Sequence, residues 1–110
     1  MTRSIKDKDS ISDNTKPLAS EIDKVIHEPA RLLIVSYLFL LESADFIYLK
    51  NETGLTWGNL STHMRKLEDA GYVEIKKTFV LKKPHTMASL TEKGIIAFED
   101  YKQKMNGILN

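Results

Sequence analysis

Residues 45–71 constrain the fold of this chain more than any other stretch, because they have the pattern of a short helix, a tight turn and a longer helix. Gly54 can adopt the positive φ with which a first helix ends. Thr56 is the expected N-cap of the second helix, since its hydroxyl can accept a hydrogen bond from a backbone N–H of the next turn. The second helix is therefore predicted over residues 56–70.

The predicted helix over residues 56–70 has two unlike faces. Its apolar stripe contains Leu60, Met64 and Leu67. The opposite face is small at its start and basic in its middle, with Gly58, Ser61, Thr62, Arg65 and Lys66. Such a face can enter a groove about 12 Å wide, with hydroxyls near base edges and long cations reaching guanine or phosphate. Taken alone, the two cations fit an ordinary solvated face better, and the segments that follow change this balance.

The composition indicates a soluble single-domain protein. The chain has 110 residues, of which 42% are hydrophobic and 28% charged. It contains no cysteine, which excludes disulfides, thiolate zinc sites and thiol nucleophiles and fits an intracellular, cytoplasmic setting. The longest apolar run, residues 32–41, is half the length that a membrane span of about twenty residues needs, so no membrane partner is expected.

The first third of the chain divides into an arm and the start of a folded domain. Residues 1–16 are polar and without periodicity, and we expect a disordered N-terminal arm without the apolar stretch of a secretory signal. The folded domain is expected over residues 17–110 and is predicted to begin with a short helix over residues 17–27. The next helix, residues 29–41, is apolar on two sides, so it needs cover from neighbouring helices or from a second subunit. Asp45 is the expected N-cap of the helix after it.

After Gly71 the spacing of apolar residues changes from 3.6 to 2, which indicates a β-hairpin. Residues 72–79 are its predicted first strand, residues 81–85 a polar tip with two adjacent lysines, and residues 86–90 the second strand. The residues expected to face inward are Val73, Ile75 and Phe79. Positive charge is concentrated here, because residues 61–85 hold six Lys or Arg against three acids although the net charge is only +1.

Thr91 is the expected N-cap of a final helix over residues 92–109. The apolar stripe of this helix is longer than so small a core can cover, so its distal half is expected to pack on a partner chain. Together with the two-sided helix over residues 29–41, it predicts a dimer contact through the first and last helices. The candidate interface residues are Leu32, Val35, Phe39, Phe98, Tyr101, Met105 and Ile108.

The order of these elements resembles a winged helix-turn-helix domain. The strings GLTWGNLSTHMRKLEDAGYVEI, KKPHT and LTEKG are similar to those of small bacterial and archaeal transcriptional regulators related to the MarR and ArsR groups. The resemblance covers roughly residues 20–101. Two features depart from the family pattern: Val80 and Leu81 precede the wing lysines where relatives often carry glycine and arginine, and the cysteine-based metal sites of the arsenic-sensing group cannot be present.

The resemblance implies an α+β, mainly helical winged helix-turn-helix fold with a two- to three-stranded antiparallel wing. It further implies a homodimer on double-stranded DNA, acting as a sequence-specific transcriptional regulator. The helix over residues 56–70 would enter the major groove, and the wing over residues 79–87 would lie on the backbone or in the minor groove. The positions carried over are Thr56, Gly58, Asn59, Ser61, Thr62, Arg65 and Lys66 for the helix, and Lys82, Lys83 and His85 for the wing.

Several alternatives remain open at this point. His27, His63 and His85 have no metal-ligand spacing, no catalytic motif is visible, and we expect neither a metal, a cofactor nor an enzyme. Trp57 could stack on a base or sugar, or pack beside Leu55. A winged-helix module that binds protein instead of DNA is the main rival function. A small apolar effector between two subunits is a further possibility, lined by Tyr37, Phe39, Phe98 and Tyr101.

Overall fold

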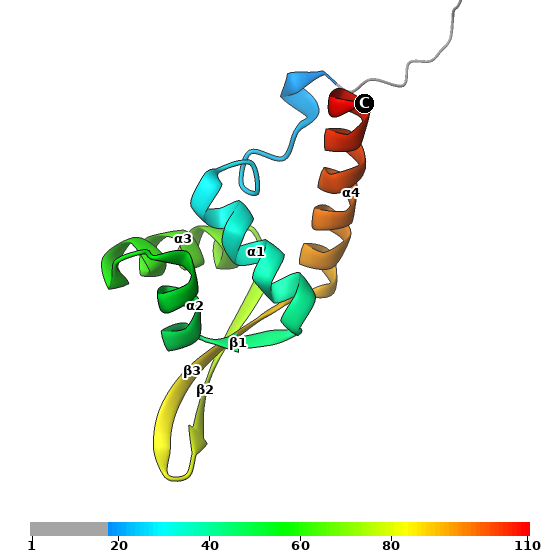
Figure 1. The fold of residues 1–110 in the computed structure, drawn as a ribbon. Coiled ribbons are helices and arrows are strands. Elements are labelled where there is room, and N and C mark those ends of the chain that lie inside the picture. Colours follow the sequence, from blue (N-terminus) through cyan, green and yellow to red (C-terminus); the bar gives the residue numbers. More distant parts are fainter. Residues whose placement is uncertain (1–17) are drawn as a thin grey trace, which may run out of the picture.

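The structure is a computed structural model that describes residues 18–110, so the predicted arm over residues 1–16 lies outside the described residues. Figure 1 shows the fold. The elements in chain order are the 3₁₀ turn η1 (Ala19–Glu21), α1 (Pro29–Leu41), β1 (Ser43–Asp45), α2 (Phe46–Thr53), α3 (Trp57–Asp69), β2 (Val73–Val80), β3 (Lys83–Leu90) and α4 (Glu92–Leu109). The predicted α+β, mainly helical class is confirmed.

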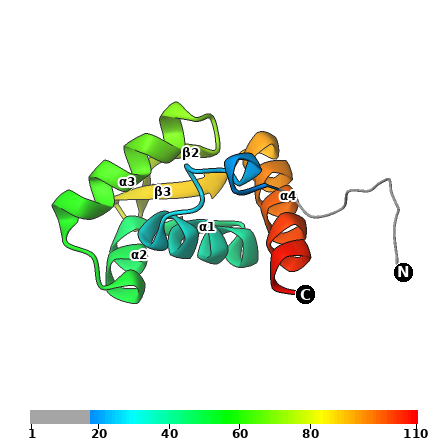
Figure 2. The same ribbon diagram turned by 90° about the horizontal axis from the view of Figure 1, so that it is seen from above.

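The helices gather at one end of a small sheet, and a long hairpin projects from the other end (Figure 1). Helices α1 and α3 contact each other, and α4 stands on the other side of α1 from α3 (Figure 2). The sheet is antiparallel with the strand order β1-β3-β2. Its register pairs Val73 with Leu90 and Val80 with Lys83, so β2 and β3 form one continuous ladder. The described residues therefore contain the three-stranded form of the predicted wing.

The core lies where α1, α2 and α3 meet the base of the sheet. Helix α3 contributes Leu60, Met64 and Leu67, the three residues of its predicted apolar stripe, and all are buried. They pack with Ile34 and Leu38 of α1 and with other buried residues from every helix. Burial of a large apolar side chain stabilises a fold by about 1.5–3 kcal/mol. The buried stripe fixes the rotation of α3 about its axis, so the opposite face of the helix points to solvent.

The predicted helix ends are confirmed. The side-chain oxygen of Asp45 accepts a hydrogen bond from Ile47 N at 2.7 Å, and that of Thr56 accepts one from Asn59 N at 3.1 Å. Gly54 ends α2 with a φ of 73°, in the left-handed region that favours glycine. The short turn between α2 and α3 thereby places the two helices as a helix-turn-helix pair.

The helix predicted over residues 17–27 is wrong. Within the described part of this segment the only helical turn is η1. The carboxylate of Asp23 accepts hydrogen bonds from Val25 N at 2.9 Å and from Ile26 N at 3.1 Å. An aspartate that accepts hydrogen bonds from backbone N–H groups two and three residues later stabilises a turn, which competes with a helix. The spacing of apolar residues in this segment does not show which of the two structures forms.

The hairpin tip is shorter in the structure than the predicted residues 81–85. Strand β3 begins at Lys83, so the turn consists of Leu81 and Lys82 alone, with φ of 53° and 66°. Two consecutive residues with positive φ match the type I′ turn, whose twist suits a two-residue hairpin. Phe79 is also not inward as predicted, since it is 75% exposed. Phe79 lies on the same face of β2 as Val73 and Ile75, but the hairpin at Phe79 extends beyond the helices, so no helix covers this side chain.

Candidate nucleic-acid interface

Helix α3 exposes the residues that the sequence predicted for its outer face. Its buried stripe turns the polar face to solvent, and all seven predicted helix positions are exposed: Thr56, Gly58, Asn59, Ser61, Thr62, Arg65 and Lys66. Within this face the Thr62 hydroxyl donates a hydrogen bond to the Gly58 carbonyl at 3.0 Å. The hydroxyl proton of Thr62 is thus engaged by the helix, and the side chain offers its methyl group and oxygen lone pairs to a ligand.

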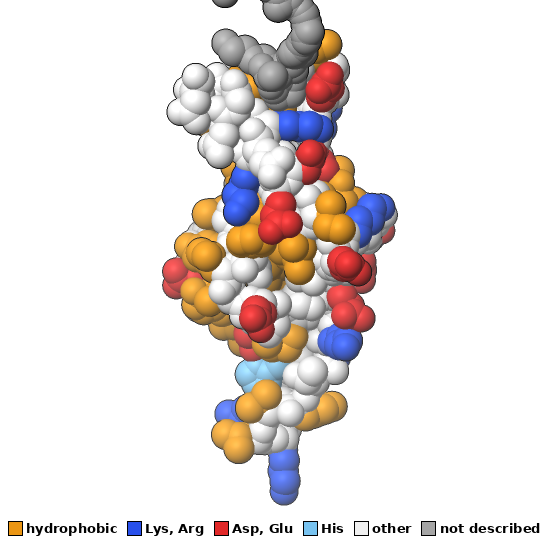
Figure 3. Space-filling model, turned by 90° about the vertical axis from the view of Figure 1, so that its right-hand side faces the viewer, with side chains coloured by type: hydrophobic (Ala, Val, Ile, Leu, Met, Phe, Trp, Pro, Cys, Tyr) orange, Lys and Arg blue, Asp and Glu red, His pale blue; other side chains and the backbone are white. Residues whose placement is uncertain are grey.

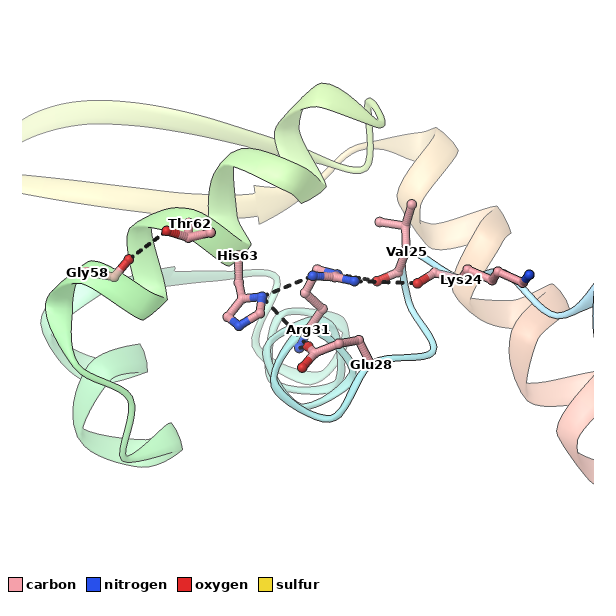
Figure 4. A network of polar contacts seen from close by, with 7 residues as sticks. All are labelled: Lys24, Val25, Glu28, Arg31, Gly58, Thr62 and His63. Atoms are coloured by element: carbon pink, nitrogen blue, oxygen red, sulfur yellow. Dashed lines mark hydrogen bonds and ion pairs between the residues drawn. The ribbon is translucent and has the colours of Figure 1, made fainter.

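A polar network holds α3 against α1 and the segment before it (Figure 4). The guanidinium of Arg31 lies 3.1 Å from His63 Nδ1 on α3 and donates to the carbonyl oxygen of Val25 at 2.5 Å. The Glu28 carboxylate accepts from Arg31 N at 2.8 Å and lies 3.7 Å from His63 Nδ1. Because these groups are fixed to three different segments, the network sets how α3 is placed on the domain.

The same network explains the acidity of Glu28. Burial would raise the pKa of this carboxyl, but the hydrogen bond from Arg31 N and the charges of His63 and Arg31 together hold the pKa below its ordinary value. His63 therefore serves to connect helices. No cluster of three or more His, Cys, Asp or Glu that could hold a metal ion occurs within residues 18–110.

The wing carries four exposed lysines, two at its tip and two midway along β2. Lys82 lies in the turn and Lys83 begins β3, and both are exposed. Lys76 and Lys77 of β2 are also exposed. A hairpin with four cations presents positive charge to a polyanion approaching its sides or end.

His85 occupies a different place from the other predicted wing residues. It is half-buried, and its Nδ1–H donates a hydrogen bond to Asp45 Oδ2. The other oxygen of Asp45 caps α2 through Ile47 N, so one carboxylate connects the wing with the helix-turn-helix pair. His85 is thus tied to Asp45 through one of its two ring nitrogens, so it helps to position the wing, and its predicted contact with DNA stays a prediction.

Asp45→Asn is expected to lower the free energy of unfolding at pH 7 by about 1 kcal/mol, because asparagine still caps α2 but accepts a weaker bond from His85. The hydrogen bond from His85 is the main reason that the pKa of Asp45 lies below its ordinary value of 3.8. A carboxyl whose pKa is lowered by folding stabilises the protein above its unfolded pKa, and this contribution is lost as the pH falls through the folded pKa.

The stabilities of wild type and Asp45→Asn should therefore converge at the acid end of a urea-unfolding series taken from pH 7 down to about pH 2. Glu99→Gln, at an exposed acid of α4, is the control for losing a negative charge. A difference between wild type and Asp45→Asn that stays constant over the whole series would contradict this role of the carboxylate.

An aromatic residue and a cation lie at the start of α3. Trp57 is half-exposed at the first helical position, and Lys50 of α2 places its Nζ 5.6 Å from the centre of the indole ring. The sequence does not indicate a role for Lys50, because no local pattern shows that α2 brings it beside Trp57. The pair adds a cation and a flat apolar surface next to the polar face of α3.

The structure changes the candidate dimer surface. Three of its seven residues belong to the core of the chain itself, with exposed fractions of 1% for Val35, 6% for Phe98 and 5% for Tyr101. Tyr101 is also hydrogen-bonded to His27 at 2.7 Å, and burial raises its pKa. These three side chains cannot face a partner. Of the others Leu32, Phe39 and Met105 are partly buried and Ile108 is exposed.

A helix-turn-helix pair followed by a projecting hairpin defines a winged-helix protein. A family model described as "Winged helix DNA-binding domain" matches residues 30–109, and the chain belongs to this family. The resemblance inferred from the sequence is thereby confirmed. Among residues 18–110 the helices are all too short or too polar to cross a membrane.

The chain is similar to several known proteins. An uncharacterized protein of Methanocaldococcus jannaschii is 40% identical over 78 residues, which are 71% of this chain and 85% of the relative. The solved structure of a transcriptional regulator homologue from Pyrococcus horikoshii is 27% identical with a TM-score of 0.73, covering 77% of this chain and 84% of that one. The transcriptional repressor BigR of Xylella fastidiosa, at 23% identity, shares the fold with a TM-score of 0.58, over 72% of this chain and 75% of the repressor.

Proposed function

We propose that this protein is a homodimeric, sequence-specific transcriptional regulator that binds double-stranded DNA and acts without catalysis in the cytoplasm. The observation that carries the proposal is the exposed face of α3, where small and hydroxyl side chains lead to Arg65 and Lys66 while the opposite face is buried. A helix presented in this way can enter a major groove, and membership of a DNA-binding family supports that use.

The residues of α3 divide into two roles. Arg65 is long enough to bind guanine O6 and N7 through two hydrogen bonds, whereas Thr56, Asn59 and Ser61 reach base edges near the start of the helix. Lys66 binds phosphate, together with Lys82 and Lys83 of the wing on the backbone or in the neighbouring minor groove. Phosphate contacts supply affinity for any sequence, and base contacts select among sequences.

The proposed dimer places two copies of α3 about one helical turn of DNA apart, roughly 34 Å, so the operator is a pseudo-palindrome. Its contact is assigned to α1 and α4, which retain exposed apolar residues that the monomer does not cover. The exposed large apolar residues of these helices are Leu33, Leu40, Leu41, Ile95, Ile96, Ile108 and Leu109. Figure 3 views the side of the molecule on which α4 lies, and hydrophobic side chains are spread along it.

The experiment that tests the proposal is fluorescence anisotropy with two labelled duplexes, the region upstream of the protein's own coding sequence and a random duplex, each at 50 and 200 mM salt. We expect tighter binding to the upstream duplex and a loss of affinity of roughly 10³-fold or more between the two salts, as found for proteins with six or more phosphate contacts. Sedimentation equilibrium should show a dimer. A folded dimer that binds neither duplex at low salt would instead support the protein-binding alternative.

A further inference from the structure

The end of the wing is apolar, which the fold itself does not explain. Three consecutive residues are exposed there, Phe79 by 75%, Val80 by 51% and Leu81 by 91%. Figure 1 shows the hairpin projecting away from the helices, and Figure 3 shows hydrophobic side chains near its end with a Lys or Arg below them. No helix among residues 18–110 covers these side chains, so they are open to contact with a ligand.

The turn holds one of these side chains at its outermost point. Leu81 has a φ of 53°, in the left-handed region that leucine adopts only at a conformational cost. Asparagine or glycine would form the same type I′ turn without this strain. The sequence therefore keeps a large apolar side chain at a position where the turn alone favours a smaller residue.

Charge around the tip indicates the chemistry of its ligand. Lys82 and Lys83 directly follow Leu81, and Lys76 and Lys77 lie further along β2. Glu74, the one acid of the two wing strands, lies near the base of the hairpin, 3.9 Å from Lys76. An apolar tip flanked by cations fits a ligand with negative charge on both sides of an apolar interior, which describes a DNA groove with its phosphates and stacked bases.

We propose that Leu81 enters the minor groove next to the major groove bound by α3 and acts as an apolar wedge between two base pairs. Phe79 and Val80 cover the opened base step, and Lys82 and Lys83 neutralise the phosphates on either side. This inference rests on the proposed DNA-binding function and deepens it. Apolar side chains inserted in this way partly unstack a base step and bend the duplex by about 20–90°.

The wedge would also contribute to sequence selection. Pyrimidine–purine steps such as TA unstack with the least work, whereas A-tracts are stiff. Binding would therefore favour a flexible step under the wing even though no hydrogen bond reads it. We expect the protein to bind a duplex with a TA step at that position about tenfold more tightly than a duplex with an A-tract there. A preference of this size matches the deformation energies of bent protein–DNA complexes.

The test compares Leu81→Gly with Lys82→Gly. Glycine suits the positive φ of both positions, so each variant keeps the turn. Two readouts use the wild-type and variant proteins: energy transfer between dyes at the ends of a 30-base-pair duplex, which reports bending, and the fluorescence of 2-aminopurine placed in TA steps, which rises on unstacking. Wild type is expected to bend the duplex and to raise the 2-aminopurine signal.

At protein concentrations that saturate the duplex, Leu81→Gly should lose both signals and Lys82→Gly should keep both. The affinity of Lys82→Gly should fall, with a salt slope reduced by about one unit for each lost phosphate contact. Equal bending by wild type and Leu81→Gly would overturn the wedge while leaving the proposed function intact. Absence of any DNA binding by wild type would overturn the proposed function and the wedge together. A third outcome is that both DNA signals are the same for wild type and Leu81→Gly, while binding to anionic lipid vesicles requires Leu81. This result would assign the tip to a membrane surface and overturn the wedge.

Discussion

Replacing Arg65 and Lys66 together with alanine is expected to abolish sequence-specific DNA binding and to leave the fold unchanged. Both side chains are exposed on α3, so their loss should change the stability of the free protein by no more than about 0.5 kcal/mol. A bidentate arginine contributes about 1–3 kcal/mol of base discrimination at each half-site. The variant loses this contribution at both half-sites, together with one phosphate contact at each. The expected loss of affinity is therefore at least about a hundredfold. Anisotropy with the upstream duplex measures it.

Arg65→Lys is the matched control, because it keeps the charge and removes the planar fork that binds guanine. It should retain the affinity and the salt slope for a random duplex but lose the preference for the upstream duplex. If the double alanine variant bound the upstream duplex as tightly as wild type, α3 would not be the reading helix, and the role assigned to its exposed face would be wrong.

Gly94→Ala is expected to destabilise the domain by about 3 kcal/mol, at the upper end of the usual range for overpacking. A Cβ atom at Gly94 would lie 2.1 Å from the carbonyl oxygen of Tyr72, which is backbone and cannot rotate away. That same oxygen accepts a hydrogen bond from Thr91 N at 3.0 Å, and the Thr91 hydroxyl donates to the Gly71 carbonyl at 2.6 Å. The start of α4 would thus be pushed off the turn between α3 and β2.

Thermal unfolding measures this effect, with an expected fall in Tm of roughly 10–25 °C for a domain of this size. Gly58→Ala is the matched control, since a Cβ atom there meets nothing within 4 Å and alanine favours a helix interior by up to about 1 kcal/mol. The control should therefore melt at or above the wild-type temperature. A Gly94→Ala protein that melts within a degree or two of wild type would contradict the close approach of α4 to Tyr72.

The parts of the fold that sequence predicted well depend on neighbouring residues. Thr56 and Asp45 cap helices through bonds to backbone two or three residues away, and Gly54 ends a helix by its own conformation. The exposed face of α3 follows from helical periodicity once the buried stripe at Leu60, Met64 and Leu67 is recognised. Such local signals sufficed to place the helix-turn-helix pair and most of the candidate DNA-binding residues.

The parts that sequence missed depend on contacts between distant segments. His85 and Asp45 lie 40 positions apart in the sequence and meet because β1 pairs with β3. Strand β1 is short, and no residue pattern indicated it. The sequence predicts that Phe98 and Tyr101 contact a partner, because the apolar stripe of α4 is longer than the expected core can cover. In the structure they turn inward, with Phe98 against Phe39 at a ring separation of 5.1 Å. Burial of this kind depends on how the helices meet, which periodicity alone does not specify.

The role of Arg31 affects how mutational data on this protein should be interpreted. Its guanidinium is directed at His63 and at two backbone carbonyls, those of Val25 and Lys24, so it is engaged by the protein. An alanine scan of the basic residues would nevertheless identify Arg31 as important for DNA binding, because its loss would release α3 from its support. A melting curve for each alanine variant separates Arg31, which supports α3 from inside the domain, from the exposed cations that are proposed to bind DNA.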